Sequence, residues 1–222
     1  MKKPKYLSRI LSLLVTVCMF TSLSGCDYLD IDKLVSVIGV GIDIDKESGD
    51  YMITAEISKL PQDQSQPIES VLLEGRGVTV SAAIEDLGAK TSGNLYFLHS
   101  VLVVFGEEAA RAGISTAVDS FMRFARTQRV VKIAVAREGA AADVFHSKAT
   151  TKPLISTELD ESIESQFKQF GLTAEKKLYE IYNNIPTGLS DLVSVITVEE
   201  NGDQMEAKVE GSAVFNDGTL SG

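Results

Sequence analysis

The sequence of 222 residues contains 31 acidic and 21 basic residues, which gives a formal net charge of −10, and 44% of its residues are hydrophobic. This acidic excess argues against a nucleic-acid-binding protein, because a phosphate backbone requires a basic surface. The apolar fraction, together with only 5 Pro, argues against disorder, and the length suits one domain or slightly more.

Residues 1–25 have the features of a secretory signal peptide. The chain begins MKKPKYLSR, with four basic residues and no acid, and continues as an apolar stretch from Ile10 to Leu23. This stretch is shorter than the roughly 20 apolar residues that a membrane-spanning helix needs. Small residues follow it, as they do in a cleavable leader.

Cys26 follows Leu23-Ser24-Gly25, a sequence that resembles the bacterial lipobox. The resemblance implies that the Cys26 thiol receives a diacylglyceryl group with acyl chains such as palmitate. It also implies cleavage between Gly25 and Cys26. The alternative is an ordinary leader followed by a coincidental cysteine. One acyl chain holds a protein only marginally, whereas two or three hold it stably, so a lipidated Cys26 would tether a folded domain to a membrane.

Removal of the leader changes the composition of the chain. Cys18, the only other cysteine, would be lost, so no disulfide or CxxC site remains. The leader also carries four basic residues and no acid, which leaves 17 basic and 31 acidic residues among 197, a formal charge of −14. This charge disfavours adhesion to anionic lipid, so the anchor is expected to hold the protein at a membrane.

The first half of the mature chain begins with strands. Two apolar segments, 34–45 and 51–58, flank the turn sequence KESGD and predict a β-hairpin. A polar loop separates them from a short predicted strand at 70–77. Apolar residues at helical spacing then predict a helix over 79–91.

Buried strands and helices alternate in the middle of the chain. Residues 99–106 and 130–136 are apolar runs of strand length. Residues 106–126 predict a helix with a break near Gly113, and residues 138–148 predict a short helix.

Two amphipathic helices are predicted over 156–170 and 173–185. The tail alternates apolar and polar residues over 192–200 and 204–215. Asn201-Gly202 lies between these two segments, which is a strong hairpin signal.

Because strands and helices are interleaved, the sequence predicts an α+β domain with a mixed central β-sheet covered by helices. We expect three parts: the leader (1–25), an N-terminal α+β domain (26–190) and a strand pair (191–222). This pair follows two helices and is cut short at Gly222. It is therefore expected to begin a further, truncated domain.

Four acidic residues around the first hairpin turn suggest a calcium loop: Asp43, Asp45, Glu47 and Asp50. An EF-hand requires Gly at loop position 6 and Glu at position 12. Counted from Asp43, those positions hold Ser48 and Thr54. A solvated hairpin turn is the preferred interpretation.

His99 and His146 are the only histidines. They lie in different predicted elements without a neighbouring ligand, whereas a zinc site needs three or four converging ligands. Because His99 precedes a buried strand, a hydrogen-bonded structural role is preferred for it. No GxSxG motif is present, although a Ser-His-Asp arrangement stays open. We therefore predict no catalytic, metal-binding or cofactor-binding residue.

A series of basic residues recurs every three positions: Arg123, Arg126, Arg129 and Lys132. It could form a patch for an acidic partner or for lipid headgroups, but a solvated face is the preferred interpretation. Gly39 and Gly41 lie on one face of a predicted strand and outside any phosphate-loop pattern. They indicate close packing of another element.

Several motifs follow one another in a characteristic order. They are Cys26, an acidic segment with Asp27, Asp30, Ile31 and Leu34, the strand end Gly41-Ile42-Asp43, the segment Leu95-Tyr96-Phe97-Leu98-His99, the residues Arg123 and Arg129, and GSAVF at 211–215. Together they resemble the Ger(x)C family of spore germination lipoproteins, which are the C subunits of nutrient germinant receptors.

This resemblance implies a non-enzymatic subunit without a cofactor, anchored through Cys26 to the outer face of the spore inner membrane. Its expected partners are the A and B subunits of the germinant receptor, and its expected role is assembly or scaffolding in spore germination. A solute-binding lipoprotein of a transport system is the alternative function, and an exported enzyme is a third.

Overall fold

The computed structural model of the chain describes residues 5–21, 34–59, 68–124, 130–202 and 204–222. The chain divides into two units, residues 1–32 and residues 33–222. In the first unit, α1 (Lys5–Thr21) covers the apolar part of the expected leader. Within the described residues, no helix combines the length and the apolar character needed to cross a membrane.

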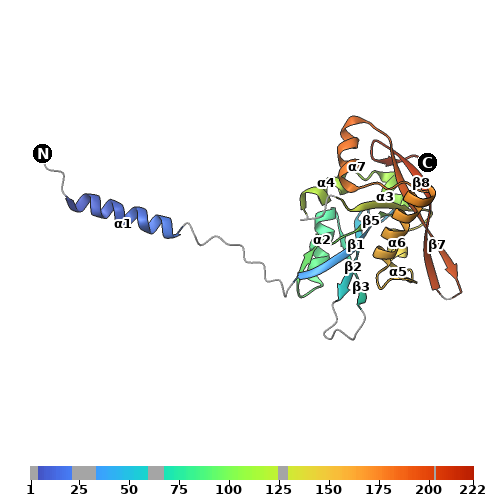
Figure 1. Cartoon of the computed structure of the whole chain (residues 1–222), viewed down its shortest axis with the longest axis horizontal. Coiled ribbons are helices and arrows are strands. Elements are labelled where there is room, and N and C mark those ends of the chain that lie inside the picture. The colour runs from blue at the N-terminus through green and yellow to red at the C-terminus, as the bar shows by residue number, and fades with distance from the viewer. Residues whose placement is uncertain (1–4, 22–33, 60–67, 125–129, 203) are drawn as a thin grey trace. The chain divides into compact units, whose positions relative to one another are not determined.

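The second unit is built on one β-sheet (Figure 1). Its strands are β1 (Leu34–Ile44), β2 (Tyr51–Lys59), β3 (Glu69–Gly77), β4 (Asn94–Tyr96), β5 (Leu102–Phe105), β6 (Lys132–Ala136), β7 (Asp191–Asn201), β8 (Gln204–Asn216) and β9 (Thr219–Leu220). They lie in the order β3-β2-β1-β5-β6-β7-β8-β9, and β4 pairs with the start of β1. The strands β1, β5, β6 and β7 are parallel. Antiparallel strands extend the sheet on both sides, β2 and β3 next to β1, and β8 and β9 next to β7.

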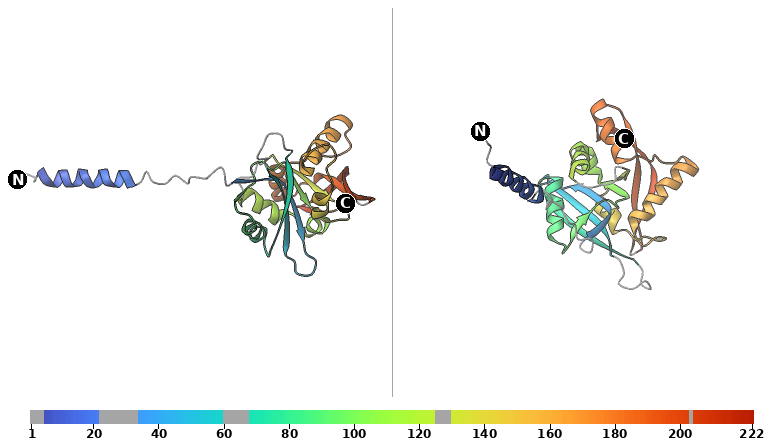
Figure 2. Two further views of the ribbon diagram at one scale, coloured as in Figure 1. Left: turned by 90° about the horizontal axis from the view of Figure 1, so that it is seen from below. Right: turned by 60° about the vertical axis from the view of Figure 1, so that its left-hand side comes forward.

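Helices cover both faces of the sheet (Figures 1 and 2). One face carries α2 (Val80–Ala89), α3 (Glu107–Ala112), α4 (Ser115–Phe124) and α7 (Leu178–Asn184). The other face carries α5 (Ala141–His146) and α6 (Ile155–Ser165), which continues as the π-helical turn η2 (Gln166–Phe170). A 3-10 turn, η3 (Ile185–Thr187), follows α7. The α-helices of the second unit bury apolar residues against the sheet, which confirms the predicted fold class.

The helix predicted over 173–185 is wrong in its first part. Only α7 is helical, and the preceding residues are extended along the amino-terminal end of β6. There the Ile133 N–H donates to the Lys176 carbonyl oxygen at 2.9 Å, and the Leu178 N–H donates to the Val131 carbonyl oxygen at 2.9 Å. Strand partners therefore satisfy backbone groups that a helix would otherwise pair internally.

The strand pair expected to begin a further domain extends the central sheet instead. β7 pairs in parallel with β6, with Ala134 opposite Ser194, and β8 pairs with β7 along most of its length. Val193 and Ala213 of this pair are buried in the same core as β1 and β5. The expected boundary at residue 190 therefore does not separate two sheets.

The close packing predicted at Gly39 is confirmed. A Cβ atom at Gly39 would overlap the side chains of Ser156 at the start of α6 and Phe145 of α5. Glycine at this position lets both helices lie directly on β1.

Candidate functional site

The carboxyl ends of β1, β5 and β6 meet at one edge of the sheet. From β1 the chain runs outward to β2 and β3, whereas β5 and all later strands of the main order lie on the other side of β1. The strand order thus reverses between β1 and β5, which is where open sheets of this kind form a crevice. A cleft of about 460 Å³ lies at this point.

Two adjoining hollows make up this crevice. The cleft at the reversal point includes Asp43, Met52, Glu107, Glu138 and Ala140 in its lining. A second hollow of about 360 Å³ shares Asp43, Met52 and Ala140 with it and extends over the carboxyl end of β3. Asp43, the last residue but one of β1, therefore lies with Met52 and Ala140 where the two hollows meet.

The Asp43 carboxylate is buried, with 5% of the residue exposed. Its Oδ1 accepts the Ala141 N–H at 2.8 Å, and its Oδ2 accepts the Ala142 N–H at 3.0 Å. Both N–H groups belong to the first turn of α5, where helical partners are lacking. Asp43 thus fixes the start of α5 to the end of β1, and the interpretation of this residue as part of a solvated turn is wrong.

Burial raises the pKa of the Asp43 carboxyl, because the charged form loses its hydration. The N–H groups of Ala141 and Ala142 act in the opposite direction, and the nearby Asp143 carboxylate adds a smaller upward effect. Gly106 makes the close approach possible, since a Cβ atom there would overlap Asp43 Oδ1. The start of α3 therefore packs directly on the Asp43 carboxylate.

Glu107 joins the loops that follow β5 and β6. Its carboxylate accepts the Glu138 N–H and, at 2.8 Å, the Arg111 Nε–H. The Glu138 N–H chiefly, and then the Arg111 side chain, lower the pKa of Glu107, because both stabilise the charged form. Glu138 itself has a positive φ of 52°, so this bond holds a backbone conformation that is uncommon for a non-glycine residue.

The rim of the crevice is a closed network of ion pairs and turn hydrogen bonds. Arg76 Nε lies 2.9 Å from Asp50 Oδ2, and the Arg76 guanidinium lies 3.3 Å from Asp45 Oδ2. Asp45 Oδ1 accepts the N–H groups of Glu47 and Ser48, at 2.9 and 3.0 Å. Asp45 and Asp50 thus share Arg76 as their partner, whereas Asp43 binds the start of α5, so these three acids do not converge on one cation site.

A second buried carboxylate lies on β2. Glu56 is 1% exposed and accepts the N–H groups of Ile155 and Ser156, at 3.0 and 2.9 Å. The hydroxyls of Ser70 and Ser156 also donate to it. Glu56 fixes the start of α6 as Asp43 fixes the start of α5. Sequence reasoning missed it, and its only sequence signal is a single acid within the apolar strand YMITAEIS.

The other candidate residues do not gather at the crevice. His99 is exposed and lies edge-on to Tyr96 at a centroid distance of 5.5 Å. The hydrogen bond at this position comes from Ser100, whose hydroxyl donates to the Val37 carbonyl oxygen at 2.9 Å. His146 ends α5, with its Nδ1 2.8 Å from the Ala142 carbonyl oxygen.

The basic series does not form one solvated face. Arg123 is exposed and pairs with Asp119 at 2.8 Å. Lys132 is 7% exposed, and its Nζ lies 2.9 Å from Asp160 Oδ1. The solvated interpretation is therefore wrong for Lys132. Arg126 and Arg129 lie outside the described residues.

The predicted lipidation residue Cys26 and the preceding Gly25 also lie outside the described residues, so the lipid anchor stays a prediction. Within the part of the chain that the structure describes, no group of three or more His, Cys, Asp or Glu side chains could hold a metal ion. At the crevice, the Asp43 and Glu107 carboxylates accept backbone N–H groups, and Arg76 is paired with Asp45 and Asp50. Such an arrangement fixes loops and helices to the sheet.

Comparisons with known proteins match most of the second unit. The family model described as Spore germination protein N-terminal domain matches residues 27–197. Among solved structures, the chain is similar to the crystal structure of the GerBC protein, at 18% identity and a TM-score of 0.40. That similarity covers 88% of this chain and 53% of the other, so the chain spans about half the length of that protein. A search of curated proteins found no match.

Proposed function

The chain belongs to the Spore germination protein N-terminal domain family, and from this premise we propose that it is a lipid-anchored, non-enzymatic subunit of a nutrient germinant receptor. The observation that carries the proposal is the extent of the family match, which begins at residue 27. This is the residue after the lipobox-like cysteine, which supports the proposed order of leader, lipid anchor and folded domain.

The proposed role is assembly. The lipid on Cys26 confines the domain to the outer face of the spore inner membrane, where tethering raises the effective concentration of membrane partners. The A and B subunits of the receptor are the proposed partners. The crevice is consistent with this role, because its charged side chains stabilise the fold through the contacts described above.

Replacement of Cys26 tests the proposal. We expect Cys26→Ala to release the protein from the membrane fraction and to weaken spore germination. Cys18→Ala, in the leader, is the matched control and should change neither. Membrane association is measured by fractionation and immunoblotting, and lipidation is measured from the mass of the N-terminal peptide. Retention of Cys26→Ala at the wild-type level would contradict the anchor.

Deletion of the gene tests the receptor role separately. Spores lacking the protein are followed by loss of optical density and by release of dipicolinic acid across a panel of amino acids, sugars and nucleosides. We expect a defect for one nutrient class, restored by the wild-type gene. An unchanged response to every nutrient would contradict a receptor function.

A further inference from the structure

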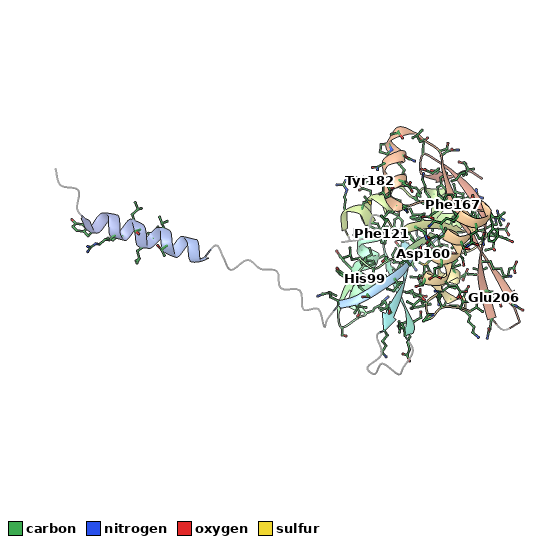
Figure 3. All side chains as sticks on the ribbon, viewed as in Figure 1. His99, Phe121, Asp160, Phe167, Tyr182 and Glu206 are labelled. Atoms are coloured by element: carbon green, nitrogen blue, oxygen red, sulfur yellow. The ribbon has the colours of Figure 1, made fainter. Side chains whose placement is uncertain are left out.

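Two phenylalanines differ from the rest of the described phenylalanines. Beyond α1, seven Phe side chains are described, and five of them are no more than 4% exposed: Phe97, Phe105, Phe121, Phe145 and Phe215. Phe167 and Phe170 are 46% and 63% exposed, and the nearby Leu172 is also 63% exposed. We call Phe167, Phe170 and Leu172 the Phe spur. Figure 3 shows Phe167 at the end of α6, apart from the buried Phe121.

The Phe spur is held in a fixed position by hydrogen bonds on both sides. Gln166 Nε2 donates to the Val209 carbonyl oxygen of β8 at 3.0 Å, and the Thr173 hydroxyl donates to the Gly211 carbonyl oxygen at 2.6 Å. The Leu172 N–H closes the turn by donating to the Gln166 carbonyl oxygen at 3.2 Å. The three apolar side chains are therefore exposed on an ordered turn that both flanking residues fix to β8.

More exposed apolar side chains lie on the two strands beside which the spur is held. Leu192 and Val214 lie opposite each other on β7 and β8, and they are 53% and 37% exposed. They lie two positions from Ser194 and Ser212, and the Ser194 hydroxyl donates to the Ala174 carbonyl oxygen just beyond the spur. An ordered group of exposed apolar side chains of this kind indicates a contact surface.

The lysines beside the spur are paired with acids. Lys168, which lies between the two Phe residues, forms an ion pair with Glu164 one turn earlier. Lys177 pairs with Glu175 at 3.6 Å. Glu210 is exposed between the two β8 residues that hold the spur, so this surface offers no excess of positive charge to an anionic headgroup layer. Its apolar side chains suit a neutral apolar phase better.

The proposed anchor supplies such a phase nearby. Only seven residues, 27–33, separate Cys26 from the start of β1. Even fully extended, they reach about 25 Å, which is less than the diameter of about 40 Å expected for a domain of this length. A domain on so short a tether keeps part of its surface close to the bilayer.

We propose that the Phe spur, together with Leu192 and Val214, contacts the apolar interior of the lipid bilayer. This inference rests on the proposed lipid anchor at Cys26. The bilayer contact adds apolar burial to the acyl chains and fixes which face of the domain points to the membrane.

The absence of Trp from the sequence provides a direct test. Phe170→Trp places a single fluorophore in the spur. Val78→Trp is the matched control, because Val78 is 76% exposed and follows β3, at the opposite end of the strand order. The full lipoprotein is extracted from membranes and reconstituted into phosphatidylcholine vesicles, with and without bromine on the acyl chains.

We expect blue-shifted emission from Phe170→Trp and several-fold stronger quenching by brominated chains than for Val78→Trp. The effect should persist in high salt. Equal, weak quenching of both variants would overturn the proposal. If the Trp emission of Phe170→Trp is blue-shifted only after the receptor's membrane subunits are added, the bilayer contact would also be overturned, in favour of a protein partner.

The mass of the N-terminal peptide separates this test from that of the anchor. A lipidated Cys26 with an unquenched Phe170→Trp overturns the bilayer contact and leaves the proposed function standing. If Cys26 is unmodified, the proposed lipid anchor is overturned. In that case the same variants are coupled through the Cys26 thiol to a maleimide lipid, and quenching by the brominated chains then tests the spur contact independently.

Discussion

The crevice at the carboxyl ends of the parallel strands and the Phe spur at the end of α6 differ in what their side chains contact. At the crevice, Asp43 and Glu107 are bonded to N–H groups of other segments. At the spur, the backbone and the flanking side chains are bonded to β8, whereas the three apolar side chains are largely exposed.

This difference indicates that the crevice residues contribute to stability and that the spur residues contribute to recognition. A side chain whose polar atoms are all bonded within the protein must lose those bonds before it can bind a ligand, and that loss is costly when the group is buried. An exposed apolar side chain on an ordered turn loses only hydration when it makes a contact. We therefore expect crevice substitutions to change the free energy of unfolding and spur substitutions to change association.

At the crevice, the largest expected effect is that of Asp43→Ala. The substitution leaves the Ala141 and Ala142 N–H groups without their acceptors, and each buried unpaired group costs about 1–3 kcal/mol. We expect a loss of about 2–4 kcal/mol in the free energy of unfolding, measured by urea denaturation of the purified protein in detergent. A loss below about 0.5 kcal/mol, the range of ordinary surface changes, would show that the crevice does not depend on this carboxylate.

Gly106→Ala provides the control for that result. The added methyl group would overlap Asp43 Oδ1, so the substitution should destabilise the wild-type protein. In the Asp43→Ala background the overlapping atom is absent, and the cost of Gly106→Ala should fall sharply. Contacting residues show such non-additivity, whereas independent sites add. Additive costs would contradict direct contact between these two positions.

A smaller and more specific effect concerns pH. The contributions of Glu107 and Asp43 to the free energy of unfolding should depend on pH with opposite sign. The folded-state pKa of Glu107 is lowered, so its contribution to stability is present above the unfolded pKa of about 4.3 and is lost as the pH falls through the folded value. The folded-state pKa of Asp43 is raised. Its contribution is present below the unfolded pKa of about 3.9 and is lost as the pH rises through the folded value.

The comparison uses Glu107→Gln and Asp43→Asn, with unfolding measured between pH 3 and pH 7 (about the range that spans both transitions). The cost of Glu107→Gln should be larger at the upper end of this range, at about 0.5–1.5 kcal/mol. The cost of Asp43→Asn should be larger at the lower end. Parallel profiles for the two variants would contradict the different environments assigned to the two carboxylates.

The regular elements could be predicted from the sequence because they depend on local patterns. The hairpin of β1 and β2, the helix α2 and the hairpin of β7 and β8 each follow from alternation, helical spacing or turn residues. The buried carboxylates could not be predicted in this way. Asp43 and Glu56 cap helices that begin 98 and 99 residues later, and a single sequence does not show which N–H group a distant acid will meet.

The sequence did not predict the Phe spur, because its helical spacing of apolar residues does not hold beyond Ile163. Ile163, Phe167 and Phe170 have the spacing of one helical face, and the sequence predicts a single amphipathic helix over 156–170. In the structure Ile163 is fully buried, but the chain then changes to the π-helical turn η2. Because a π turn contains more residues than an α turn, the next two aromatic side chains rotate away from the core.

The smallest expected effect on stability is that of Phe170→Ala, and it completes the comparison. Since the Phe170 side chain is mostly exposed, its removal should change the free energy of unfolding by no more than about 0.5 kcal/mol. Phe121→Ala, in the core, should cost about 3–5 kcal/mol. A large cost for Phe170→Ala would mean that the side chain is needed for folding. Unchanged stability together with weaker retention on phosphatidylcholine vesicles would mean that the exposed aromatic ring acts in a contact outside the domain.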